Sequence, residues 1–232
     1  MATIAENAIA KAAGEVTNGK ETNGSAVAKK GEEVAVEVEP KTGVSFPVKL
    51  DDGKQLNCVG VRKKSMLGLG IKIYAFGMYA DNEKLKDVLK SKIGKAPEKP
   101  NKELYQLVID SDVEMVVRLV IVFSSLTMSM VRKNFEEGLG ASIRKLTGGK
   151  KNDELANKLM GEASDNIKLT PGSLIEISRL PGYVLEMKVM GEVISKVESE
   201  LLFRAYINLY LGDDPLDKDA KDKFGMSLIS LF

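Results

Sequence analysis

The chain has 232 residues, of which 44% are hydrophobic, and its 34 Lys and Arg residues nearly balance its 33 Asp and Glu residues. This length and apolar content suffice for one globular domain with a sizeable core and a terminal tail. A net charge of +1 gives no bulk attraction for nucleic acid, and no apolar run in the sequence reaches the roughly 18–20 residues that span a bilayer.

Two residue counts exclude several kinds of catalytic and metal site. Histidine is absent from the sequence, and Cys58 is its single cysteine. No intramolecular disulfide, thiolate metal cluster, Ser-His dyad or Cys-His dyad can therefore form. We predict no metal ion and no cofactor, and we interpret Cys58 as a small buried side chain rather than as a nucleophile.

Residues 1–41 differ in composition from the rest of the chain. They are rich in Ala, Glu, Lys, Asn, Gly and Val, and no aromatic residue precedes Phe46. Such a segment buries too little apolar surface to offset the entropy lost on ordering, so we predict a disordered tail over 1–41 and a globular domain over 42–232. The tail has seven Glu and no Arg, which is a poor match to a plastid transit peptide.

The globular part opens with three predicted strands, over residues 43–50, 54–61 and 71–79. The first two flank Asp51-Asp52-Gly53, a turn sequence that indicates a β-hairpin. Both faces of the third strand are largely apolar, so we expect other elements to cover both faces of the sheet. The small residues Ala75 and Gly77 would let one of these elements approach closely.

Later segments are predicted to be mostly helical. We predict helices over 82–93, from Ser124 or Ser125 to about 146, and over 152–163, 193–211 and 217–232, with strands over 115–123, 173–179 and 183–189. Strands that are followed mainly by helices indicate an α+β protein, in which a helical layer covers an antiparallel sheet.

The segment Ile71-Lys72-Ile73-Tyr74-Ala75-Phe76-Gly77-Met78-Tyr79-Ala80-Asp81 resembles the central strand of chalcone isomerases and their relatives. The similarity continues in order over about residues 43–232, through Val131-Arg132-Lys133, Pro171-Gly172 and Tyr210-Leu211-Gly212. This resemblance implies an open-faced β-sandwich with a ligand cleft between the large sheet and the helices. The family includes plant enzymes, non-catalytic isomerase-like proteins and fatty-acid-binding proteins of plastids.

The resemblance also lets the polar catalytic residues of the enzymes be compared with this chain. Arg62 matches their arginine, but their strand threonine is replaced by Tyr74. Their helical tyrosine and asparagine fall at Met130 and Glu137, and their last threonine falls around Asn208 or Leu209. These losses imply a protein without isomerase activity. An arginine followed by a tyrosine in the strand is what the fatty-acid-binding branch looks like.

We therefore predict a non-catalytic, monomeric protein that holds a free fatty acid of medium to long chain in the cleft. The carboxylate would bind the guanidinium fork of Arg62 and the hydroxyl of Tyr74. Phe76 and Met78 share the face of Tyr74 by strand alternation, and Met130 adds a soft apolar side chain from the helix. We expect these three residues to contact the acyl chain.

Other interpretations stay open at this stage. One is a chalcone–flavanone isomerase with an altered site, and another is a non-catalytic helper of the flavonoid pathway that binds enzymes without lipid. Arg118 is a rival carboxylate partner, unless it forms a structural ion pair with Glu136 or Glu137. The resemblance implies the plastid stroma, whereas the composition of the tail favours the cytoplasm.

Overall fold

The computed structural model describes residues 35–66, 69–161 and 167–232. The strands are β1 (Val36–Val38), β2 (Ser45–Pro47), β3 (Gln55–Met66), β4 (Leu69–Ala80), β5 (Met115–Ile121), β6 (Leu174–Leu180), β7 (Val184–Val189) and β8 (Glu192–Glu198). The helices are α1 (Asn82–Lys92), α2 (Lys102–Asp110), α3 (Met128–Leu146), α4 (Asp153–Lys158), α5 (Glu200–Leu211) and α6 (Lys218–Ile229). The disorder predicted for residues 1–34 lies outside the described residues, and β1 falls within the last part of the predicted tail.

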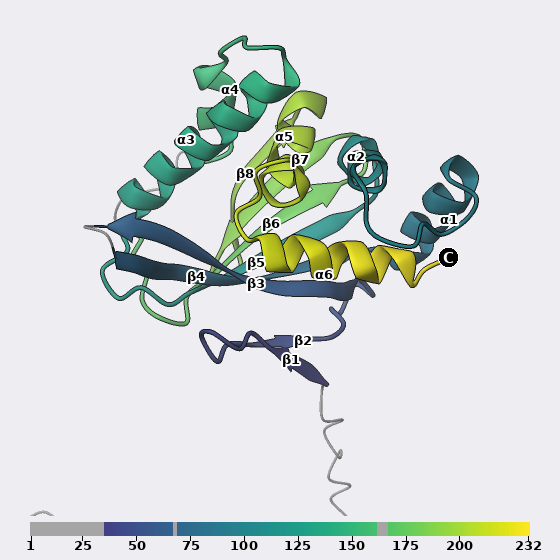
Figure 1. Cartoon of the computed structure of the whole chain (residues 1–232). Helices are drawn as coiled ribbons and strands as arrows, with labels where there is room; N and C mark the ends of the chain where they lie inside the picture. Colours follow the sequence, from purple (N-terminus) through teal and green to yellow (C-terminus); the bar gives the residue numbers. More distant parts are fainter. Residues whose placement is uncertain (1–34, 67–68, 162–166) are drawn as a thin grey trace, which may run out of the picture. The chain divides into compact units, whose positions relative to one another are not determined.

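Strands β3 to β8 form one antiparallel sheet in which each strand pairs with the next along the chain. Figure 1 shows the helices on one side of this sheet and the β1–β2 hairpin on the other. Helix α3 packs on α5, α5 packs on α2 and β7, and α6 runs along β3. The predicted α+β class, with an antiparallel sheet under a helical layer, is confirmed. None of the helices in the described ranges is long and apolar enough to cross a membrane.

Both faces of the sheet are covered, as the apolar character of the third predicted strand indicated. The large core lies between the sheet and the helices and includes Cys58, which is 1% exposed. Burial raises the pKa of its thiol, which is consistent with a structural cysteine. On the other face, Phe46 from β2 packs with Val59 and Ala75. A Cβ atom at Gly77 would lie 2.8 Å from the Phe46 ring, so this glycine allows the close approach that we predicted.

The prediction of one helix over residues 193–211 is wrong in its first part. Residues 192–198 form the edge strand β8, which pairs with β7, and the helix α5 begins only at Glu200. The side chain of Ser199 accepts a hydrogen bond from the Leu202 N–H and so caps α5. The β-branched residues Val193, Ile194 and Val197 favour the strand before this cap.

Two further helix predictions need correction. Helix α2 was not predicted, although Asn101 caps it by accepting a hydrogen bond from the Leu104 N–H at 2.9 Å. Helix α3 begins after Thr127, whose hydroxyl accepts from the Met130 N–H at 3.2 Å, and not after Ser124 or Ser125. Capping residues are common in loops, so the sequence alone did not show which one starts the helix.

Candidate functional site

A β-bulge in β4 shapes the site. Arg62 on β3 is paired with Tyr74 on β4, and the next pair joins Lys63 to Lys72, so Ile73 has no partner on β3. A bulge adds one residue to a strand and redirects the neighbouring side chains. Ile73 and Tyr74, which are adjacent in sequence, consequently both line the same cavity.

The cavity lies between the inner face of the sheet and helices α3 and α5, and its volume is about 50 Å³. Its lining residues are Arg62, Lys64, Ile73, Tyr74, Leu119, Ile121, Leu126, Val131, Asn134, Phe135, Gly138, Ile175, Leu209, Tyr210 and Leu216. Most of these side chains are apolar, and the polar ones come from β3, β4, α3 and α5. This arrangement suits a ligand with a polar head and an apolar tail.

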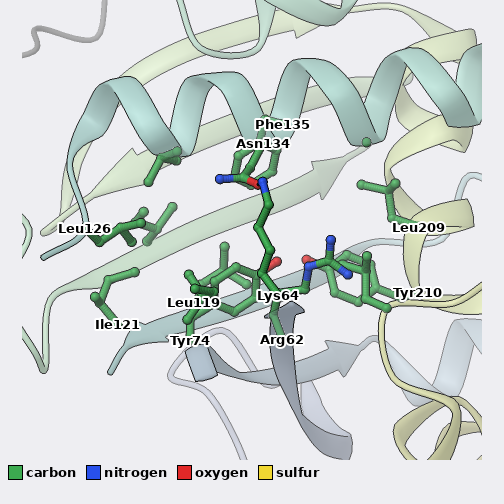
Figure 2. Close-up of a pocket in the computed structure, with 15 residues that line it drawn as sticks. Arg62, Lys64, Tyr74, Leu119, Ile121, Leu126, Asn134, Phe135, Leu209 and Tyr210 are labelled. Carbon is green, nitrogen blue, oxygen red and sulfur yellow. The ribbon is translucent and has the colours of Figure 1, made fainter. Parts of the chain in front are cut away.

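Arg62 and two tyrosines form the polar end of the cavity. In Figure 2 the hydroxyl ends of Tyr74 and Tyr210 converge beside the guanidinium of Arg62. No residue in the described part of the chain forms a hydrogen bond or an ion pair with that guanidinium. A half-buried cation at an apolar cavity is costly without a partner, so this position favours an anionic ligand group.

The tyrosines of this region are neutral hydroxyl donors at physiological pH. Burial raises the pKa of Tyr74, and the positive charge of Arg62 opposes part of that rise. Burial also holds the pKa values of Tyr206 and Tyr210 well above the ordinary value for tyrosine. The hydroxyl oxygens of Tyr206 and Tyr210 lie 3.4 Å apart. The site therefore offers an anion one permanent positive charge together with uncharged hydroxyl groups.

Lys64 adds a second cation, two residues beyond Arg62 on the same strand. Its Nζ donates a hydrogen bond to Oδ1 of Asn134 on α3 at 2.8 Å, and it lies 3.9 Å from a carboxylate oxygen of Glu137. Asn134 in turn donates through Nδ2 to the carbonyl of Met130 at 2.6 Å. Figure 2 shows the Lys64 side chain reaching from the sheet to the helix. This polar pair links β3 to α3 across the cavity.

The structure brings together two of the five predicted ligand residues. Arg62 and Tyr74 line the cavity, whereas Phe76, Met78 and Met130 are not among its lining residues. The Tyr210 ring packs edge-on against Phe76, with 5.1 Å between the ring centroids, and separates this part of β4 from the cavity. Met78 lies farther along the same strand, in the core.

Met130 fails to reach the cavity because of its position on the helix. The α3 residues that face the cavity are Val131, Asn134, Phe135 and Gly138. The resemblance placed the tyrosine and asparagine of the isomerases at Met130 and Glu137, which are seven residues apart. Val131 and Gly138 have the same spacing and face the cavity, so the cavity-facing positions lie one residue later than the resemblance placed them. Neither of them is a tyrosine or an asparagine, so the loss of the isomerase pair holds in both registers.

The remaining isomerase position lies on α5. Leu209 lines the cavity there, and the neighbouring Asn208 instead donates a hydrogen bond to the Ser142 hydroxyl at 2.8 Å.

Three polar residues of the cavity were not predicted from the sequence, namely Lys64, Asn134 and Tyr210. Side chains two residues apart on a strand lie on the same face, so the position of Arg62 could have predicted that Lys64 faces the cavity as well.

Arg118 does not compete for the role of Arg62. Its Nε lies 2.7 Å from Oε1 of Glu176, its partner on the neighbouring strand β6, and its guanidinium carbon lies 5.8 Å from the Tyr79 ring centroid. The expected ion pair therefore exists, but the predicted partners Glu136 and Glu137 were wrong. Tyr79 packs on the sheet face away from the main core, so Arg118 is not available to the cavity.

An open antiparallel sheet with a cavity beneath its helical layer matches the expected fold class, and comparisons with known proteins show the family. A sequence profile described as chalcone isomerase-like matches residues 42–224. The chain therefore belongs to the chalcone isomerase-like family.

Individual relatives support this membership. The chain is 62% identical over 200 residues to chalcone isomerase-like protein 1 of Humulus lupulus, covering 85% of this chain and 94% of that protein. It is 39% identical over 191 residues to fatty-acid-binding protein 1 of Arabidopsis thaliana, covering 81% of this chain and 68% of that protein. A crystal structure of an Arabidopsis thaliana fatty-acid binding protein matches with a TM-score of 0.78 at 38% identity, covering 85% of this chain and 98% of the other.

Proposed function

We propose that this protein binds a free fatty acid and does not catalyse a reaction. The observation that carries this proposal is the position of Arg62, which lines an apolar cavity, has no ionic partner among the described residues and faces Tyr74 on the next strand. A carboxylate would supply the missing charge. The similarity to proteins named for fatty-acid binding supports the same ligand class.

The two ends of the ligand would contribute differently to binding. The charge-assisted hydrogen bonds at Arg62 and Tyr74 are each worth about 1.5–3 kcal/mol net and require an acid. Each buried methylene adds about 0.8 kcal/mol, so roughly ten methylenes contribute on the order of 8 kcal/mol before the entropy of association is subtracted. The acyl chain would therefore dominate the affinity, and the polar head would fix the orientation.

Ligand binding would require the cavity to widen. A volume of about 50 Å³ holds a few water molecules, which is less than a medium-length acyl chain needs. The apolar lining from α3 and the segment before it consists of Leu126, Val131 and Phe135. We propose that these side chains move apart from the sheet to admit the chain, while Arg62 and Tyr74 stay fixed by strand pairing.

Isothermal titration of the purified protein with dodecanoate and hexadecanoate tests the proposal. We expect saturable binding of one acid per chain, and a strong loss of affinity in the Arg62→Ala variant. The Lys63→Ala variant is a matched control, because Lys63 is an exposed neighbour on the same strand and does not line the cavity. Absence of binding in the unmodified protein would overturn the proposal.

A second candidate function rests on the 62% identity to a protein named chalcone isomerase-like protein 1. On this alternative the chain is a helper of the flavonoid pathway that binds enzymes without lipid. Capture of a polyketide synthase by protein with a demonstrably empty cavity would favour it. An altered isomerase is the remaining alternative, and chalcone cyclisation above the spontaneous rate that falls in Tyr74→Phe would favour that one.

The cellular compartment is a separate proposal. The fatty-acid-binding branch that the sequence resembles is plastidial, so we propose the plastid stroma, with the cytoplasm as the alternative. Expression of the chain with a C-terminal fluorescent protein in leaf cells distinguishes the two. Fluorescence confined to the cytoplasm would reject the stroma.

A further inference from the structure

The cavity contains more hydrogen-bonding groups than one carboxylate can use. A carboxylate offers about four lone-pair sites. The fork of Arg62 can occupy two of them, and the hydroxyls of Tyr74 and Tyr210 can occupy one each. Lys64 and Asn134 also line the cavity and are left without a role in binding a plain carboxylate.

Lys64 and Asn134 form a fixed polar pair. The Asn134 amide is held at both ends, because its Oδ1 accepts from Lys64 at 2.8 Å and its Nδ2 donates to the Met130 carbonyl at 2.6 Å. The Lys64 ammonium has three N–H donors, and the bond to Asn134 uses one of them. Its contact with the exposed carboxylate of Glu137 is longer, at 3.9 Å. Lys64 can therefore donate to a ligand without leaving Asn134.

The spacing of the two cations sets where such a ligand group must lie. Arg62 and Lys64 are separated by one residue on β3 and face the same cavity. Their Cα atoms are thus about 7 Å apart, and their side chains reach different points along one ligand. The Lys64 side chain is 41% exposed, so its ammonium remains accessible to water beside an unsubstituted acyl chain, which offers it no acceptor. A ligand oxygen near the carboxylate would instead accept its hydrogen bond.

On the basis of the proposed function, we propose that the site prefers fatty acids with a second oxygen, as a hydroxyl or ketone on the second or third carbon. Lys64 is the residue that recognises this oxygen, with Asn134 as its positioning residue. Arg62, Tyr74 and Tyr210 bind the carboxylate of both plain and oxygenated acids. Lys64 thus determines the preference between acids, and Arg62 contributes to the binding of all of them.

The test compares dodecanoate with 2-hydroxydodecanoate and 3-hydroxydodecanoate by isothermal titration. We expect at least one hydroxy acid to bind the unmodified protein about tenfold or more tightly than dodecanoate, as a hydrogen bond from a charged donor provides. The Lys64→Met variant should lose this preference, so that its affinities for the three acids agree within about threefold. Lys63→Met is the control for removal of one positive charge from the same strand.

Asn134→Ala provides a second variant in case Lys64→Met does not fold, and it should reduce the preference because Lys64 loses its anchor. Equal affinities for the three acids in the unmodified protein would overturn this inference and leave the proposed function intact. A Lys64→Met variant that loses dodecanoate as strongly as the hydroxy acids would also overturn it, by making Lys64 a carboxylate ligand. Failure of every acid to bind would overturn both.

Discussion

Arg62 on β3 and Tyr74 on β4 lie directly opposite each other at the polar end of an apolar cavity. Their cross-strand pairing means that both can contact one carboxylate. Arg62→Ala and Tyr74→Phe should each weaken dodecanoate binding by about 10- to 100-fold. Because the two groups would bind the same anion, the double variant should lose less affinity than the sum of the two single losses. Titration calorimetry on all four proteins measures this coupling, and fully additive losses would contradict a shared anion.

Gly138 on α3 faces the cavity and permits a test of where the acyl chain lies. A Cβ atom at this position would lie 3.4 Å from Leu209, which is an ordinary contact. Gly138→Ala should therefore be accommodated, and it should raise the free energy of unfolding by about 0.5–1 kcal/mol through helix propensity. Gly138→Leu should fill the cavity and reduce acid binding more than tenfold while the protein stays folded.

Circular dichroism and titration of both Gly138 variants give the two readouts. The alanine variant serves as the control for changing the glycine itself. Unchanged binding in Gly138→Leu would mean that the acyl chain does not lie beneath α3.

The fold was largely predictable because the hydrophobic pattern and the family resemblance both indicated an antiparallel sheet under a helical layer. Two predicted site residues, Arg62 and Tyr74, line the cavity. The position of Ile73 was not predictable, because a register shift in strand pairing depends on both strands and leaves no local sequence signal. Phe76 follows the expected alternation, yet Tyr210 from a helix distant in sequence covers it. Alternation indicates which face a side chain occupies, but it does not show which other element packs there.

Buried tyrosines should make the protein sensitive to alkali. Tyr79 and Tyr105 are 0% and 6% exposed, and burial raises the pKa of each to about 12. Their unfolded pKa is about 10, so the unfolded state loses these protons first as the pH rises. The stabilisation from each tyrosine is complete below pH 10 and is lost between about pH 10 and 12, on the order of 2 kcal/mol each.

Urea titrations between pH 8 and 12 measure this loss. Tyr105→Phe should flatten the dependence on pH. An equally steep decline in this variant would assign the effect to other groups.

Arg179 on β6 supports the helical layer from within the core. It is 0% exposed, its guanidinium carbon lies 3.8 Å from the Phe203 ring centroid, and it donates hydrogen bonds to the carbonyls of Val108 and Ser111 at the end of α2. Arg179→Met would remove the arginine donor from both carbonyls, although the Val108 carbonyl would keep the hydrogen bond from the Ser111 hydroxyl. We expect the free energy of unfolding to fall by about 2–4 kcal/mol. Urea denaturation measures the change, with exposed Lys63→Met as the control. A loss below about 0.5 kcal/mol would show that water replaces the arginine.

Native mass spectrometry of the protein purified from bacteria, with extraction and identification of any bound small molecule, tests the central claim most directly. We predict one fatty acid per chain in the unmodified protein and in Lys63→Ala, and none in Arg62→Ala. An empty unmodified protein that also fails to take up added dodecanoate or hexadecanoate would contradict the fatty-acid-binding function.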